Sequence, residues 1–430
     1  MSLFIPLREL PKSPQYKKGD VMVMFGELFT RGYANGIVEE AERIGMKVIY
    51  STVGRRDAEM NLRPLTAEEL AEKAQPLINI PLEAGFDLEP DSKGRRPVDQ
   101  LKEYGLTGWE AAELDWDSLN DSRKRGTERF QKATQAFLKE VQKLIPAGAN
   151  VLFVHTMAGG FPRAKVVMPI ANRVFKGSGA RFLSSETFWK SQIGKLCDVS
   201  FNEVTAETLR HLIQQSEGLR HEVKNGGGQV SYVAYGYHGN EALIGGDYKW
   251  YSYSPYLQGW AKIKMEEVAA EAFSKGIPAH VMNVPEILTN SSSIFLGVEI
   301  SLYTLIRAIK KENRDPKKTQ ELIDECQALL KDGFTFDDVD AATQEYLTNP
   351  KVLNYPSFKN WPQHNAPEQM ELMRQASQKI LDMHKDQKHL LTAHLSEIVF
   401  KATGKVMLAE SYKPRAPIQW MGHDLVAKLF

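Results

Sequence analysis

The chain of 430 residues has few cysteines, no net charge and no long hydrophobic run. Its two cysteines, Cys197 and Cys326, stand far apart, which argues against a disulfide framework and predicts buried thiols in a reducing compartment. Basic and acidic residues both number 54, so the overall charge does not favour binding to nucleic acid. No segment approaches the roughly 20 apolar residues that cross a bilayer. We therefore expect a cytoplasmic protein without a membrane span.

Several catalytic signatures are also missing. The ten histidines show no ligand spacing, and neither His-Glu-x-x-His nor Cys-x-x-Cys occurs, so we predict no metal. The chain contains no Gly-x-Ser-x-Gly elbow and no P-loop, which argues against an α/β-hydrolase and a P-loop NTPase.

What the chain does contain is an opening strand–turn–helix–strand unit. An apolar run at 21–25 predicts a buried parallel strand, and a glycine-containing turn, a helix at 37–44 and a strand at 47–52 follow it. Such a unit holds a pyrophosphate at the helix N-terminus, so we expect Gly26, Gly32 and Tyr33 to contact a dinucleotide. The spacing Gly-x5-Gly-x3-Gly is looser than the usual fingerprint, and a plain turn is the alternative.

The end of the second strand predicts the adenosine side of this site. Ser51, Arg55 and Arg56 stand where the ribose of a dinucleotide would lie. Arginines there favour a 2′-phosphate, so NADPH is the preferred prediction. The following Asp57 keeps NADH open, and solvated loop arginines are the other interpretation.

Two further strand ends add candidates. Ala158 follows a predicted strand at 149–155, and small residues there let a cofactor ring approach the backbone. Thr289 follows a predicted strand at 278–284, in a loop rich in hydroxyl and amide groups that can hydrogen-bond a carboxamide or phosphate. The same loop can instead cap the next helix.

The stretch 230–262 carries the predicted chemistry. A strand leads into an aromatic-rich loop, and a helix begins near Lys262. A lysine beside a phenol stabilises the phenolate, so Tyr253 and Lys262 can form a proton-transferring pair. Tyr251 and Tyr256 stay open as the phenol, and the alternative is an aromatic loop that only covers a core.

Taken together, these segments resemble a large short-chain dehydrogenase/reductase. More specifically they are similar to the trans-2-enoyl-CoA/enoyl-ACP reductases of the FabV type. The resemblance lies in residues 234–242 with Tyr237, in the Tyr-x8-Lys spacing of Tyr253 and Lys262, in 288–303, and in Thr156 to Ala158 with Pro162-Arg163. It spans about residues 20–345.

The resemblance implies a doubly wound parallel α/β sheet of the Rossmann type. We expect a catalytic domain over 1–345, a helical insertion around 58–148 that forms a substrate lid, and a helical extension over 346–430. The implied reaction is NAD(P)H-dependent reduction of an enoyl thioester carried by CoA or acyl carrier protein, by a monomer or small homo-oligomer.

In this interpretation Tyr253 stabilises the enolate or supplies a proton, and Lys262 holds the ribose and tunes Tyr253. Tyr237 is a second phenol near the thioester, and Thr289 contacts the nicotinamide side. Two alternatives stay open: a related reductase of ketones or other activated alkenes, and a dinucleotide sensor without turnover.

Overall fold

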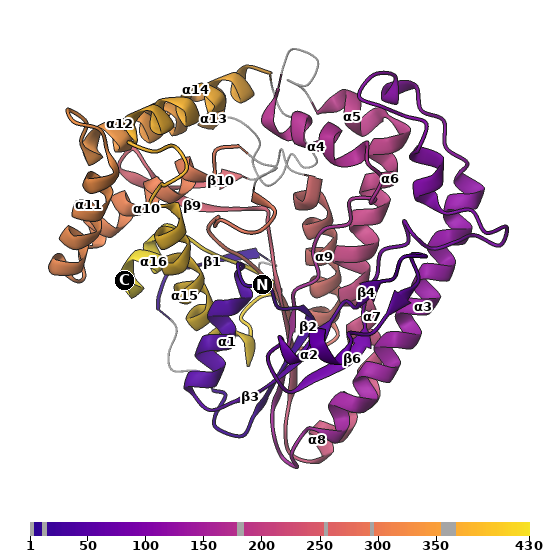
Figure 1. Ribbon diagram of the computed structural model, residues 1–430. Helices are drawn as coiled ribbons and strands as arrows, with labels where there is room; N and C mark the ends of the chain where they lie inside the picture. Colours follow the sequence, from indigo (N-terminus) through magenta and orange to yellow (C-terminus); the bar gives the residue numbers. More distant parts are fainter. Residues whose placement is uncertain (1–3, 11–14, 179–184, 253–256, 293–295, 354–366) are drawn as a thin grey trace.

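The structure is a computed structural model and describes residues 4–10, 15–178, 185–252, 257–292, 296–353 and 367–430 (Figure 1). Its centre is an eight-stranded parallel sheet in the order β1-β12-β11-β8-β7-β2-β3-β6. The strands are β1 (Phe4–Leu7), β2 (Val21–Glu27), β3 (Lys47–Thr52), β6 (Leu77–Pro81), β7 (Val151–His155), β8 (Val230–Tyr235), β11 (Ala279–Asn283) and β12 (Ile418–Met421).

Both faces of the sheet are buried, which explains why its strands read as continuous apolar runs. Alternate residues of β2 enter two separate cores, with Met22 and Met24 in one and Val23 and Phe25 in the other. On the first face lie α1 (Ala34–Arg43) and α15 (Thr392–Ser411). On the second lie α3 (Trp116–Lys143), α7 (Thr208–Gln215), α8 (Glu217–Asn225) and α9 (Leu257–Ser274). The predicted doubly wound α/β architecture is confirmed.

The remaining helices gather mainly beyond the carboxyl ends of the strands, in two groups that Figure 1 shows apart from each other. One group is α4 (Val167–Lys176), α5 (Glu186–Lys190) and α6 (Gln192–Phe201), which continues into a π-helical segment at Asn202–Glu207. The other is α10 (Val298–Glu312), α11 (Pro316–Leu329), α12 (Phe336–Leu347), α13 (Pro350–Leu353) and α14 (Pro367–Met383), with α16 (His423–Leu429) packed on α10.

Two predicted segments contain strands as well as helices. The segment after residue 345 is not only helical, because β12 pairs in parallel with both β1 and β11 and extends the central sheet. Residues 58–148 also combine helices with a strand. They contain α2 (Ala67–Ala71) and the edge strand β6, while α3 packs against β6.

The aromatic stretch after β8 is a hairpin, where the sequence predicted a loop. β9 (Gly239–Ile244) pairs antiparallel with β10 (Asp247–Ser252) around Gly245 and Gly246. A two-residue glycine turn favours such a tight hairpin, because glycine adopts the positive φ that the turn requires. A second small hairpin joins β4 (Arg55–Arg56) to β5 (Leu62–Arg63).

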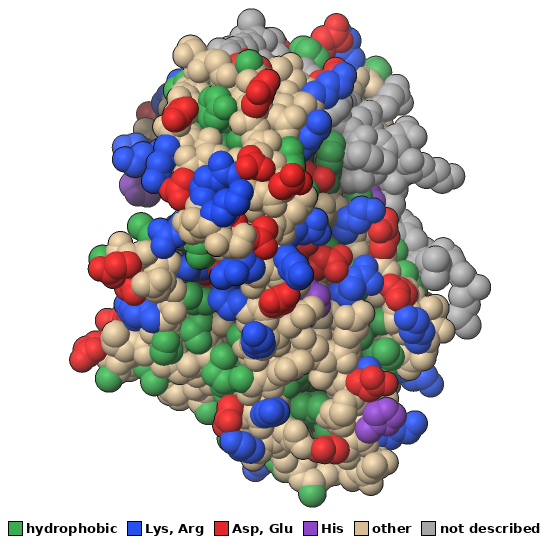
Figure 2. Space-filling view, turned by 90° about the vertical axis from the view of Figure 1, so that its right-hand side faces the viewer, with side chains coloured by type: hydrophobic (Ala, Val, Ile, Leu, Met, Phe, Trp, Pro, Cys, Tyr) green, Lys and Arg blue, Asp and Glu red, His purple; other side chains and the backbone are tan. Residues whose placement is uncertain are grey.

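The exterior carries both signs of charge. Figure 2 shows lysine and arginine side chains interspersed with aspartate and glutamate on the face it presents, in keeping with a formal net charge of zero. Among the residues that the structure describes, no helix combines the length and the apolar character that crossing a membrane demands.

Helices α1 and α15 cross in backbone contact at two glycines. A Cβ atom added to Gly36 would lie 1.9 Å from the carbonyl oxygen of Phe400, and one added to Gly404 would lie 2.0 Å from the carbonyl carbon of Gly36. The third glycine of the opening turn is therefore required by helix packing. This contact holds the start of α1 against the C-terminal part of the chain.

We predict that Gly404→Ala destabilises the fold by about 3 kcal/mol or more, because the methyl group must push two helix backbones apart. Gly218→Ala in α8 is the matched control, since nothing lies within 4 Å of its added Cβ. Denaturant unfolding followed by circular dichroism measures both. Equal stability of the two variants would contradict the packing role.

Candidate active site

A cavity of about 640 Å³ lies at the carboxyl ends of the central strands. Its walls come from the segments that follow β2, β7, β8 and β11, together with α9. The structure brings together here six residues predicted from the sequence: Gly32, Tyr33, Ala158, Tyr237, Lys262 and Thr289. These residues are up to 257 positions apart in the chain (32 to 289), and the parallel sheet aligns them because its strands end at one edge.

The glycine turn forms one wall of this cavity. Gly26 has φ +122°, and a Cβ there would lie 2.5 Å from the hydroxyl of Thr156, so only glycine fits. Ser51 lines neither this cavity nor the smaller one described next. Its hydroxyl accepts from the Gly26 N–H at 3.0 Å and lies 3.2 Å from the Gly26 carbonyl oxygen, and it therefore fixes the turn from behind.

A smaller cavity of about 260 Å³ adjoins the first and shares Glu27, Thr156 and Ala158 with it. Gly26, Val53 and Leu82 line it, so it extends toward the ends of β3 and β6. The N-terminus of α1 opens on the larger cavity at Tyr33 and Ala34. The pair of cavities suits an elongated ligand with a central phosphate group.

The two predicted adenosine-side arginines are engaged by carboxylates. Arg55 donates to Glu27 at 2.9 and 3.0 Å, and Arg56 forms an ion pair with Glu83. Burial alone would raise the pKa of Glu27, but hydrogen bonds from Arg55, Lys73 and Thr52 together lower it to about 2. The preference for NADPH assumed that Arg55 and Arg56 were free to bind a 2′-phosphate. Because both are paired with carboxylates, they no longer favour NADPH over NADH.

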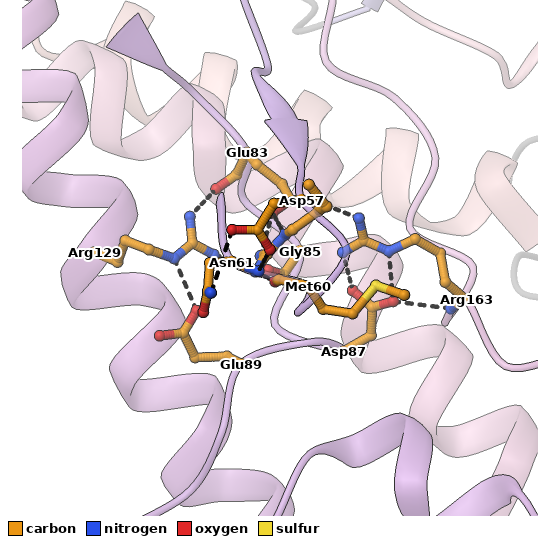
Figure 3. Close-up of polar contacts among 10 residues, drawn as sticks. Asp57, Met60, Asn61, Glu83, Gly85, Asp87, Glu89, Arg129 and Arg163 are labelled. Carbon is orange, nitrogen blue, oxygen red and sulfur yellow. Dashed lines mark hydrogen bonds and ion pairs between the residues drawn. The ribbon is translucent and has the colours of Figure 1, made fainter. Parts of the chain in front are cut away.

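The loop after β6 is tied down by two more arginines (Figure 3). Arg129 of α3 donates to the backbone oxygens of Glu83 and Gly85 at 2.7 and 3.0 Å and to Glu89 at 2.8 Å. Arg163, from the segment after β7, donates to Asp87 at 2.7 and 2.8 Å. This loop therefore forms a fixed wall of the smaller cavity.

Lys262 is buried in the larger cavity. It is 5% exposed, and the described residues supply no hydrogen bond or ion pair to its amine. Burial lowers the pKa of Lys262 to about 7. His155 at the end of β7 stays neutral, because burial and then the charge of Lys262 lower its pKa to about 3.

The helix that carries Lys262 is anchored one turn further on. The buried carboxylate of Glu266 accepts from the Asn283 amide at 2.7 Å and lies 3.3 Å from the His238 ring. The Asn283 side-chain oxygen accepts a hydrogen bond from the backbone N–H of His238 at 2.8 Å. These bonds join α9, β11 and the segment after β8, and so fix the positions of Tyr237 and Lys262 relative to each other.

A carboxyl group that the sequence analysis did not single out lies beside Tyr237. The Tyr237 hydroxyl donates to Glu286 at 2.7 Å, and Glu286 is 4% exposed. The Tyr33 hydroxyl donates to the Pro285 carbonyl at 2.9 Å, which holds the adjacent peptide. The available signal was position: Glu286 follows the end of β11, as Thr289 does three residues later.

The predicted catalytic phenol at Tyr253 lies outside the described residues, as does Tyr256. The backbone of Tyr251 belongs to β10. The described residues also hold no group of three or more histidine, cysteine, aspartate or glutamate side chains placed to bind a metal ion.

The chain is similar to known proteins over its whole length. The family whose sequence profile matches residues 3–430 is described as "Enoyl-acyl carrier protein reductase FabMG". An apo structure of a FabMG enoyl-acyl carrier protein reductase is 44% identical, with a TM-score of 0.94, covering 100% of this chain and 98% of that one. An NADH-bound FabMG structure is 36% identical, with a TM-score of 0.79 and the same coverage. A sequence search among curated proteins finds no significant match.

We predict that Lys262→Met raises the stability of the protein while removing its buried amine. The pKa of Lys262 falls from 10.5 to about 7 on folding, and each pKa unit corresponds to about 1.4 kcal/mol. Between these values the unfolded chain binds more protons, so this residue's cost to folding declines as pH rises. The gain on substitution is therefore largest near or below pH 7 and fades toward pH 10.

Thermal unfolding at about pH 6.5 and about pH 9.5 measures this difference. Lys264→Met is the matched control on the same helix, because Lys264 is exposed and pairs with Glu267 at the surface. A lower melting temperature of Lys262→Met at both pH values would contradict the prediction.

Proposed function

Because the chain belongs to the FabMG family of enoyl-acyl carrier protein reductases, we propose that its paired cavities bind NADH and the enoyl group of an acyl carrier protein thioester in the cytoplasm. The observation that carries the proposal is the larger cavity, where Lys262, Tyr237 and the N-terminus of α1 meet. A bound dihydronicotinamide supplies the hydride that reduces the β-carbon of the substrate.

Features of the cavities support this assignment to a dinucleotide. The first turn of α1, at Tyr33 and Ala34, offers backbone N–H groups and the positive end of a helix dipole to a pyrophosphate. Gly159 leaves room for a planar ring against the backbone, because nothing lies within 4 Å of a Cβ added there. Lys262 and Thr289 supply donors for a ribose and a carboxamide.

NADH is the proposed reductant rather than NADPH. A 2′-phosphate would need a free cation beside the smaller cavity, and Arg55, Arg56 and Arg163 are already paired with Glu27, Glu83 and Asp87. Bringing a doubly charged phosphate against these carboxylates would cost repulsion. The NADH-bound relative agrees with this choice.

In the reaction, the chain's own residues stabilise the charge that develops on the thioester oxygen. Lys262 and Tyr253 are assigned to this task, with Lys262 lowering the pKa of the phenol. Tyr237 is assigned to the other side of the acyl group. Burial of Lys262 strengthens each of these interactions, because its charge is largely removed from bulk water.

The test of the function is oxidation of NADH by purified protein with a trans-2-enoyl-acyl carrier protein, followed by loss of reduced-nicotinamide absorbance. Tyr253→Phe and Lys262→Ala should each lower kcat by about 100-fold or more, and Lys264→Ala should leave it unchanged. Full activity of Tyr253→Phe, with loss in Tyr251→Phe or Tyr256→Phe, would move the phenol to that position. No oxidation by the wild type would refute the function.

A second test concerns the cofactor. Arg55→Ala should weaken NADH and NADPH about equally, because Arg55 holds Glu27 and its guanidinium meets no 2′-phosphate. Ratios of kcat/KM for the two cofactors in wild type and variant measure this. A selective loss with NADPH would support the phosphate-binding role that the sequence predicted.

A further inference from the structure

We infer that Glu286 is the proton store of this active site, delivering a proton through the hydroxyl of Tyr237 to the α-carbon of the substrate. This inference rests on the proposed function and extends it. Reduction of an enoyl thioester needs a hydride at the β-carbon and a proton at the α-carbon, and the assigned cofactor supplies only the first.

The geometry places the two groups in direct contact at the cavity. Tyr237 lines the larger cavity and is half-buried, whereas Glu286 lies behind it and lines neither cavity. Their oxygen atoms are 2.7 Å apart, which is an ordinary distance for proton exchange between hydroxyl and carboxyl. Tyr237 therefore links Glu286 to the cavity.

The surroundings of Glu286 favour its protonated form. Burial raises the pKa of Glu286 to about 7, against the lowering effect of the Tyr237 hydrogen bond and with a further upward effect of Glu299. Among the described residues, the charged or titratable groups that face it are Tyr237 after β8, Tyr33 at the start of α1 and Glu299 of α10. None of these is a cation, and the Tyr237 hydrogen bond that favours the carboxylate is weaker than the effect of burial.

The segment is also held in place. The Tyr33 hydroxyl binds the carbonyl of Pro285, and the Tyr33 ring stacks on Tyr235 at 5.6 Å between ring centroids. Tyr235 in turn donates to the Tyr33 carbonyl at 3.3 Å. Glu286 therefore has little freedom to leave Tyr237, as a relay requires.

Hydride addition at the β-carbon reduces the alkene and leaves the electron pair as an enolate. A new C–H bond forms at the α-carbon with the proton of the Tyr237 hydroxyl, while the O–H bond of Glu286 breaks and its proton restores Tyr237. Water returns one proton to Glu286 through Tyr237 after the product leaves.

The experiment uses the full-length protein with NADH and a trans-2-enoyl-acyl carrier protein under single-turnover conditions. Glu286→Gln keeps the shape of the side chain but holds no transferable proton. It should lower the turnover rate by about 100-fold and leave the Kd for NADH unchanged. It should also remove one ionisation from the alkaline side of the pH profile, where the rate falls as Glu286 deprotonates.

Glu410→Gln is the matched control, since Glu410 is a buried glutamate that pairs with Arg415 and lines neither cavity. The double variant Glu286→Gln/Tyr237→Phe should be no slower than Tyr237→Phe, because both substitutions interrupt the same proton-transfer path. In the wild type, single turnovers in mixtures of H2O and D2O should give a curved proton inventory, and this measurement needs no variant.

A Glu286→Gln rate within about twofold of the wild type, with an unchanged pH profile, would overturn the relay. A strictly additive double variant or a linear proton inventory would also overturn it. These results require an active wild type, so they are distinct from failure of the proposed function, in which the wild type itself does not oxidise NADH.

Discussion

Burial of the Lys262 amine is the constraint around which the active site is built. An ammonium that has no carboxylate beside it is costly in a protein interior, and here the described residues provide none. Hydrogen bonds one helical turn further along α9 offset the cost of burying this amine. There Glu266 accepts from the Asn283 amide and lies beside the His238 ring. The same bonds hold the segment that presents Tyr237, so the amine and the phenol share one support.

The two ends of the paired cavities use charge in opposite ways. At the smaller cavity, arginines and carboxylates neutralise each other in a dense network, so Arg55, Arg56 and Arg163 are already paired. At the larger cavity, burial holds Lys262 and Glu286 near their titration points, with pKa values of about 7. One end therefore selects by shape and the other is suited to exchange protons.

Much of the architecture was predictable because buried parallel strands leave a clear pattern. The apolar runs at β2, β7 and β11 located the sheet, and the residues just after them, Ala158 and Thr289 among them, do line one cavity. The hairpin β9–β10 was missed because aromatic-rich segments read equally well as loop or strand. The contribution of β12 was missed because four residues carry too short a pattern.

The sequence by itself determined the order of strands and turns, and hence which residues could reach the carboxyl edge of the sheet. Only the tertiary structure decided which of these side chains are paired with an opposite charge and which are not. Arg55 and Arg56 looked available, but Glu27 and Glu83 approach them from other strand ends. Glu286 was not singled out from the sequence, but folding places it beside Tyr33, Tyr237 and Glu299. Charge state and pairing depend on neighbours distant in the chain, and folding alone sets those distances.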